Sequence, residues 1–258
     1  MKKIASLVAV ATLSMASAAA FANDCPVSHA QLQTALDTAV SVDNGGLNYD
    51  MWGTVVNRDG AVCAVVKSIN AATSNSVADP WPGSRVISAQ KANTANAFSN
   101  AQLSLSTANL YSAVQPGGSL FGLQHSNPVD VRAAYRGNSA NNGAANDPMN
   151  GLKIGGVNVF GGGLALYDAS TGELVGAVGV SGDTSCADHN VAMRTRDELG
   201  YDWGLAASIG GIDADGTDNI VYNDNIGAGL EAAFNQPQCG FGEEAVNDTI
   251  MTGLLPST

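Results

Sequence analysis

Basic residues, histidines, aromatic side chains and long hydrophobic runs are all scarce in this sequence. Only 11 lysines and arginines stand against 23 aspartates and glutamates, which gives a formal net charge of -12. Nucleic acids and anionic lipid surfaces bind basic surfaces, so we exclude both as partners. Beyond the apolar stretch from Ile4 to Ala20, no hydrophobic run is long enough to cross a bilayer, and we expect no membrane span.

Several catalytic motifs are also missing. The sequence has no Gly-Lys-Ser or Gly-Lys-Thr of a Walker loop, and no Cys-x-x-Cys of a thioredoxin-type or c-type haem site. The run LVGAVGVSGDTSCAD, residues 174–188, has the spacing G-x-x-G-x-x-G and not the dinucleotide-binding G-x-G-x-x-G. Its Ser181 does not form a nucleophile elbow, because Asp183 stands where that motif needs glycine. The motifs therefore support neither a nucleotide enzyme nor a serine hydrolase.

The glycines of residues 174–188 have two interpretations. Glycine inside a strand marks the close approach of another backbone or of a ligand. We favour packing, with the alanine-rich segment 84–99 as the close neighbour, because the glycines at 161–163 repeat the pattern. The alternative is an anion-binding edge, formed by the strand end, a Gly-Ser loop and a helix N-terminus. Residues 185–188 also fit an S-x-x-D capping box.

The first 22 residues have the pattern of a secretory signal peptide. Lys2 and Lys3 precede an apolar stretch, and Ala20-Phe21-Ala22 is a small-x-small cleavage site. Cleavage there leaves residues 23–258 and removes two lysines and no acids, so that the formal charge moves from -12 to -14. We expect a periplasmic or secreted protein.

Four cysteines remain after this cleavage, at Cys25, Cys63, Cys186 and Cys239. An even number in an oxidising compartment predicts two disulfides, and the sequence leaves all three pairings open. Free thiols or a metal site are the alternative.

Periodicity and turn signals predict helices alternating with hairpins. We expect helices at 28–42, 84–99 and 186–199, a short helix within 100–115, and strands at 52–57, 61–67, 163–167 and 174–180. Hairpins make antiparallel pairs, so the fold class is α+β, a central antiparallel sheet with helices on its faces. A long loop rich in glycine and asparagine fills 115–151.

Three segments together carry a family resemblance: SAQKANTANAF at 88–98, GGVNVFGGGLALYD at 155–168 and LVGAVGVSGDTSCADHNVA at 174–192. With the hairpin VVNRDGAVCAVV at 55–66, they resemble the GlcG/HbpS-like family, also called the haem-degrading domain family. The resemblance covers about residues 28–200, and the cysteines and the tail suggest a longer, exported branch.

The resemblance implies a profilin-like α/β/α sandwich that forms homo-oligomers. Some members bind haem or corrinoids, and one secreted relative works with a sensor kinase. We therefore expect a signal peptide at 1–22, a GlcG/HbpS-like domain at 23–200, and a C-terminal extension at 201–258 packed on the same domain.

The histidines are the first candidates for the axial ligand of a haem, since histidine is a common ligand of haem iron. His125 lies in the long loop and His189 follows the glycine strands, whereas His29 begins the first helix. Each is equally compatible with a surface or hydrogen-bonded histidine. The weaker alternatives are Met51, Met149 and Tyr135.

Two cations close together, Arg85 and Lys91, are candidates for holding haem propionates or a small carboxylate. Their alternative role is pairing with local acids such as Asp79. Trp81 either stacks on a planar ligand or packs the loop. Asp188 is a candidate ligand-binding residue beside His189, and either could transfer protons in an enzyme.

The segment DADGTDN, residues 213–219, resembles a fragment of a calcium loop, with Asp213, Asp215 and Asp218 as oxygen ligands. It is not an EF-hand, because its glycine comes at the fourth position and no glutamate stands at the twelfth. The alternative is a simple Asp-Gly turn.

We expect an exported homo-oligomer that holds haem or a similar tetrapyrrole in a pocket under the 115–150 loop. One alternative is an enzyme acting on a small carboxylate or on haem, and another is a ligand-free signalling partner. No acid–base pair with diagnostic spacing supports an enzyme.

Overall fold

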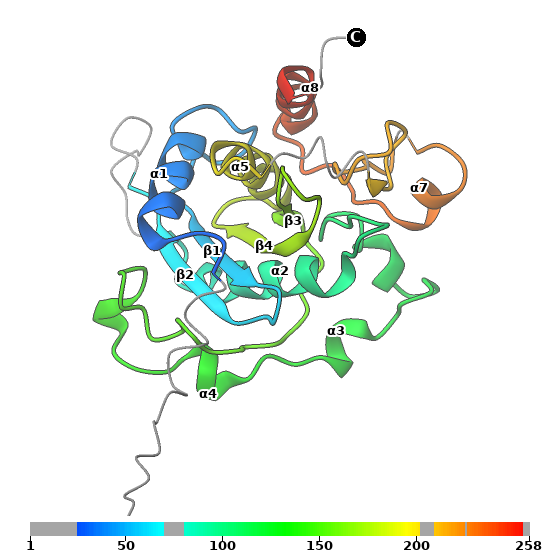
Figure 1. Ribbon diagram of the computed structural model, residues 1–258. Helices are drawn as coiled ribbons and strands as arrows, with labels where there is room; N and C mark the ends of the chain where they lie inside the picture. Colours follow the sequence, from blue (N-terminus) through cyan, green and yellow to red (C-terminus); the bar gives the residue numbers. More distant parts are fainter. Residues whose placement is uncertain (1–24, 70–79, 202–208, 225, 255–258) are drawn as a thin grey trace, which may run out of the picture.

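The computed structural model describes residues 25–69, 80–201, 209–224 and 226–254 (Figure 1). The predicted signal peptide lies outside the described residues. No described helix is both long enough and apolar enough to cross a membrane.

Four antiparallel strands form the central sheet, in the order β2-β1-β4-β3. The strands are β1 Trp52–Asn57, β2 Val62–Lys67, β3 Gly163–Tyr167 and β4 Leu174–Ser181. Each hairpin pairs its own two strands, and β1 joins the hairpins by pairing antiparallel with β4. The α+β prediction is confirmed, and all four strands lie where the turn signals placed them.

Helices cover both faces of this sheet (Figure 1). The helices α1 His29–Val40 and α5 Ser185–Glu198 pack on one face, and α2 Ser84–Phe98 packs on the other. The alternation of strand side chains divides the core in two, because Val55 joins the α1/α5 cluster and Val56 joins the α2 cluster.

The strand glycines allow the backbone of α2 to pack closely against the sheet. A Cβ atom on Gly179 would lie 2.0 Å from the carbonyl oxygen of Ser88, and one on Gly163 would lie 2.5 Å from that of Lys91. Any side chain there would push the helix outward, so the packing interpretation of these glycines is confirmed.

The connecting segments form only short helices. The helix expected within 100–115 is reduced to turns and the 3₁₀ turn η1 Ser112–Val114, because polar residues interrupt the apolar pattern. The long loop contains α3 Leu123–Ser126, α4 Val131–Ala134 and the 3₁₀ turn η2 Ser139–Asn141.

Among its described residues, the C-terminal segment contains the helices α7 Leu230–Ala233 and α8 Glu243–Leu254. The sequence analysis did not foresee α8, which packs against α5. Its apolar residues Ile250 and Met251 join the core cluster on the α1/α5 face.

Two disulfides settle the pairing that the sequence left open. Cys25 pairs with Cys63, and Cys186 pairs with Cys239. The first ties the start of the described chain to β2, and the second ties α5 to the C-terminal segment.

Candidate functional site

A groove lies at the end of the sheet where both hairpin turns meet. Since β1 and β4 are antiparallel, Asn57 at the end of β1 lies beside Gly176 near the start of β4. The cavity measures about 470 Å³. Its lining comprises Cys25, Pro26, Asn57, Arg58, Asp59, Asp168, Leu174, Val175 and Tyr201.

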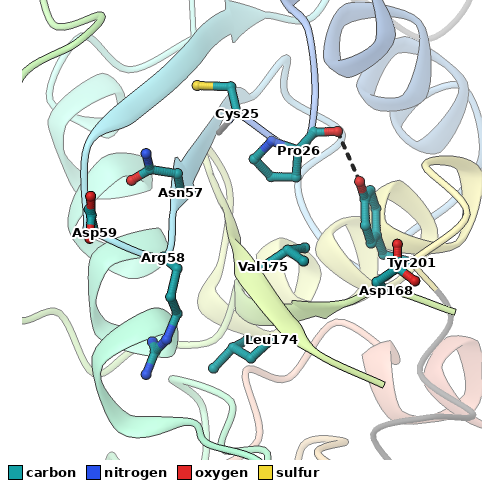
Figure 2. Close-up of a pocket in the computed structure, with 9 residues that line it drawn as sticks. All are labelled: Cys25, Pro26, Asn57, Arg58, Asp59, Asp168, Leu174, Val175 and Tyr201. Atoms are coloured by element: carbon teal, nitrogen blue, oxygen red, sulfur yellow. Dashed lines mark hydrogen bonds between the residues drawn. The ribbon is translucent and has the colours of Figure 1, made fainter. Parts of the chain in front are cut away.

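Apolar surface forms the floor of this groove. Figure 2 shows Leu174 and Val175 between the Arg58 turn on one side and Tyr201 on the other. Tyr201 follows α5, and its Oη donates a hydrogen bond to the carbonyl oxygen of Pro26 at 2.9 Å. The Cys25–Cys63 disulfide holds the neighbouring wall in place.

Arg58 brings an unbalanced positive charge to the rim. Its guanidinium donates to the backbone carbonyls of Asn96 and Ser99 and to Asn96 Oδ1, and all three acceptors are neutral. Among the described residues, no carboxylate lies within ion-pair distance of it. The groove therefore combines an apolar floor with one cation and two carboxylates, Asp59 and Asp168.

The opposite rim carries Asp168 beside Tyr201. Hydrogen bonds from Ser170 and Thr171 hold the pKa of Asp168 below its usual value, so it stays ionised and braces the β3–β4 turn. Burial, and then the charge of Asp168, raises the pKa of Tyr201. A smaller hollow of about 290 Å³ shares Tyr201, Asp168 and Pro26, and it extends the groove toward α1.

The predicted anion-binding edge is closed by the protein's own carboxylate. Asp188 Oδ2 lies 2.6 Å from Lys91 Nζ, and Oδ1 accepts the backbone N–H groups of Gly182 and Asp183 at 3.0 and 2.9 Å. Burial raises the pKa of Asp188 to about 6, against the opposing charge of Lys91, and lowers the pKa of Lys91. The pair joins α2 to α5 inside the core.

The helix cap lies one residue before the predicted one. Thr184 is the N-cap of α5, and its hydroxyl accepts the backbone N–H of Ala187. The capping-box prediction at 185–188 was wrong, because the Asp188 carboxylate turns toward Lys91 and the glycine loop.

His189 lies in the core. Its exposed fraction is 0%, and its Nε2 accepts the backbone N–H of Ile220 at 3.1 Å. Burial lowers the pKa of His189 to about 4, so the ring is neutral. His125 is exposed on α3, and His29 Nε2 lies 2.9 Å from the carbonyl oxygen of Gly143. None of the three histidines lines the groove.

Arg85 is likewise engaged inside the protein. Its guanidinium makes two hydrogen bonds to the buried carboxylate of Asp147 and a third to the carbonyl oxygen of Ala134. This arrangement fastens the long loop onto α2. The local acid proposed from the sequence, Asp79, lies outside the described residues.

The 213–218 loop gives no support for calcium. Asp218 is buried and paired with Arg196 at 2.7 Å, and it also accepts the hydroxyl of Ser104. Burial opposes its ionisation, but Arg196 and Ser104 outweigh this and keep the pKa of Asp218 low. Asp213 is bound to Thr217, and Asp215 is exposed, so the three carboxylates do not converge.

The remaining candidates are dispersed. Met51 and Met149 are buried in the core clusters on opposite faces of the sheet, whereas Tyr135 is exposed. Trp81 is half-exposed, and its ring meets that of Tyr49 edge-on at 5.4 Å.

Comparison with known proteins places this fold in a family. A family model described as "Haem degrading protein HbpS-like" matches residues 27–196. The chain belongs to the HbpS-like family. No curated protein matches it.

Three solved structures are similar to this chain. The Klebsiella pneumoniae protein ORFY is 25% identical, with 67% of this chain and 90% of that chain covered and a TM-score of 0.44. A PduOC:haem complex is 22% identical, with 66% and 89% covered and a TM-score of 0.43. A double mutant of Streptomyces reticuli HbpS is 14% identical, with 76% and 97% covered and a TM-score of 0.40.

The groove contains residue types that could hold a haem. Tyrosine is one of the side chains that ligate haem iron, and Tyr201 is the lining residue of that type. Arg58 can pair with a propionate, and Leu174 and Val175 present apolar surface to a macrocycle. The sequence analysis overlooked both polar residues, because Arg58 looked like a turn residue and Tyr201 follows the last recognised motif. One signal could have pointed to Arg58: two antiparallel hairpins in one sheet place both of their turns at the same end.

Proposed function

We propose that this chain is an exported protein that binds haem, or a closely related tetrapyrrole, in the groove between Arg58 and Tyr201. The observation that carries the proposal is that a phenol, a guanidinium without an ion-pair partner among the described residues and an apolar floor line one groove of a chain from a haem-degrading family. The two disulfides support a location in an oxidising compartment.

Each wall has a distinct role in this proposal. Leu174, Val175 and Pro26 would contact the macrocycle, Arg58 would pair with a propionate, and Tyr201 would supply the iron ligand. Tyr201 Oη donates a hydrogen bond to the carbonyl oxygen of Pro26, and it would have to release that proton to ligate iron as a phenolate. Haem would supply an iron centre for electron transfer or oxygen chemistry.

Binding is favoured over catalysis by the state of the charged side chains. The Lys91–Asp188, Arg85–Asp147 and Arg196–Asp218 pairs are all buried and mutually satisfied. They fasten segments of the fold, so none of them offers a free acid or base to a substrate.

The test is a haemin titration of residues 23–258, followed by Soret absorbance. Tyr201→Phe should weaken binding at least tenfold and change the ferric spectrum, because it removes the iron ligand and keeps the ring. Tyr135→Phe makes the same chemical change outside the groove and should leave binding unaltered. Arg58→Gln should weaken binding less than Tyr201→Phe and should affect haem esterified at its propionates less than free haem.

Histidine variants separate this proposal from its rivals. If His125→Ala abolishes the Soret shift and Tyr201→Phe does not, the iron ligand lies in the long loop. If His189→Gln alone abolishes it, the core must open to admit haem. A shift that never saturates, with every variant alike, would exclude a haem site and point to smaller carboxylates or to a protein partner.

A further inference from the structure

The buried ion pair between Lys91 and Asp188 differs in its chemistry from the buried pairs made by Arg85 and Arg196. The side chains of Lys91 and Asp188 are 1% and 3% exposed, and Lys91 Nζ lies 2.6 Å from Asp188 Oδ2. In the other two pairs the cation is a guanidinium, which stays protonated inside a protein. A buried lysine can lose its proton and become a nucleophile. Of these pairs, Lys91–Asp188 alone can therefore react within itself.

The surroundings of the pair favour its neutral form. Burial lowers the pKa of Lys91 and raises that of Asp188 to about 6, against the attraction between the two charges. Gly162 lies over the pair, since a Cβ atom there would be 3.1 Å from both Lys91 Nζ and Asp188 Cβ. When the proton moves from the ammonium to the carboxylate, a free amine lies against a carboxylic acid. These are the reactants for an amide bond.

Backbone N–H groups hold the second oxygen of the Asp188 carboxylate. Asp188 Oδ1 accepts the N–H of Gly182 at 3.0 Å and that of Asp183 at 2.9 Å. These are the distances at which the donors of an oxyanion hole stabilise the negative charge of a tetrahedral intermediate. Asp188 also lies in the first turn of α5, where the helix dipole favours negative charge. Attack on the carboxyl carbon therefore places charge on an oxygen that already has two donors.

The same neighbours would satisfy an amide in place of the ion pair. Lys91 Nζ donates to the carbonyl oxygen of Val180 at 3.0 Å as well as to Asp188. An amide between the two side chains has one N–H, which can keep the Val180 oxygen as its acceptor. Its carbonyl oxygen is the former Oδ1, which keeps the N–H donors of Gly182 and Asp183. The buried product would thus leave no polar group without a partner.

We propose that Lys91 Nζ and Asp188 Cγ condense in the folded chain to form an isopeptide bond. The amine nitrogen bonds to Cγ, and Oδ1 takes the negative charge. The bond between Cγ and Oδ2 then breaks, and Oδ2 leaves as water with two protons that began on Nζ. The ammonium and the carboxylate together give one amide and one water, so the step needs no oxidant, reductant or cofactor. Holding the two groups in contact supplies the high effective concentration that favours the bond.

The bond would fasten the two faces of the sheet to each other. It joins the middle of α2 to the first turn of α5, at residues 97 positions apart in the chain. The Cys25–Cys63 and Cys186–Cys239 disulfides can be reduced, whereas an amide persists under reducing conditions. The helices on opposite faces of the sheet would therefore stay joined in any redox state. The proposal does not depend on haem binding, because neither residue lines the groove.

Intact mass spectrometry of residues 23–258, with both disulfides reduced, tests the bond directly. The wild-type chain should be lighter than its sequence by the mass of one water. Lys91→Arg keeps the positive charge but cannot form the bond, so it should have its full sequence mass. Lys153→Arg makes the same change at an exposed lysine and should still lose water. Asp188→Asn should lose ammonia in place of water and reach the wild-type mass, because both chains give the same amide.

Peptide mapping locates the loss of water. Trypsin does not cleave after an acylated lysine, so the reduced wild-type chain should yield one branched peptide made of residues 86–132 and 154–194. A wild-type chain of full sequence mass would overturn the proposal, and this result stands even if the variants do not fold. So would a loss of water that persists in Lys91→Arg, or one that maps to the Asp-Gly steps at 59–60 or 215–216, where a succinimide gives the same change in mass.

Discussion

The sheet with its three helices and the C-terminal segment are held in different ways. In the sheet, apolar side chains alternate between two buried clusters, as Val55 and Val56 do on β1. The C-terminal segment meets α5 through the apolar residues of α8 and through buried polar contacts. Arg196 pairs with Asp218, and the N–H of Ile220 donates to His189.

The two kinds of contact differ in what they contribute: apolar burial contributes stability, and polar contacts select one arrangement of the segments. Apolar burial is non-directional, so the sheet core is stable but accepts several similar packings. A buried ion pair contributes little net stability, yet removing one partner leaves a buried charge without compensation. We call the Arg196–Asp218 ion pair and the hydrogen bond from Ile220 N–H to His189 the polar joint. It defines one position for the C-terminal segment, and removing one partner should lower the free energy of unfolding sharply.

The largest expected effect on stability comes from removing one partner of the Arg196–Asp218 ion pair. Arg196→Met leaves the Asp218 carboxylate buried and unpaired, and should lower the free energy of unfolding by about 3–5 kcal/mol. Urea unfolding at pH 7 measures it. The double variant Arg196→Met with Asp218→Leu should recover most of the loss, because it removes both charges. A single variant that costs under about 1 kcal/mol would mean that water reaches Asp218.

The two disulfides compare the regions at similar loop length. They close loops over sequence separations of 38 and 53, so chain entropy predicts a similar loss for each, about 2–4 kcal/mol on replacement by alanine. Without Cys186–Cys239, however, the C-terminal segment should become sensitive to limited proteolysis before the sheet unfolds. Without Cys25–Cys63, no such early cleavage is expected after Gly200. Fully cooperative unfolding of both variants would show that segment and sheet form a single unit.

The sheet core is tested by overfilling it. Gly179→Ala forces a Cβ against the Ser88 carbonyl oxygen, and should cost about 1–3 kcal/mol by pushing α2 outward. Gly83→Ala is the matched control, since nothing lies within 4 Å of its added Cβ and its φ is -63°. Thermal melting of both variants makes the comparison. Equal melting temperatures would mean that α2 has room beside the sheet.

The sheet could be predicted from the sequence because its signals are periodic and local. Alternating apolar runs and the turn at 58–60 placed β1 and β2, and glycine spacing indicated the contact with α2. The sequence analysis did not predict α8, because its sequence follows a glycine-rich, acidic stretch and its apolar face is short. Its position depends on α5, which no local pattern encodes.

The candidate site was harder to predict for the same reason. Charge and motif singled out Lys91, Asp188 and His189. Charge alone, however, does not distinguish a buried ion pair from an open binding site. Arg58 and Tyr201 are far apart in sequence, yet they line one groove, Arg58 from the β1–β2 turn and Tyr201 from the residues after α5. Their roles follow from pairing order and burial, which are properties of the fold.

The last prediction concerns the pH dependence of the joint at His189, an effect that is absent at neutral pH. Its pKa is about 4 in the folded chain, below the usual 6.5, so the unfolded chain binds the proton more readily. Its contribution is complete above pH 6.5 and is lost as the pH falls toward 4, at up to about 1.4 kcal/mol per unit. His189→Gln keeps an acceptor for Ile220 N–H and removes this dependence. The stability of wild type minus that of the variant, measured by urea unfolding, should therefore fall between pH 6.5 and 4. Asp188, whose raised pKa acts in the opposite sense, is common to both proteins and cancels. If the difference in the free energy of unfolding between the two proteins stays constant with pH, His189 is in contact with water and is not buried in the polar joint.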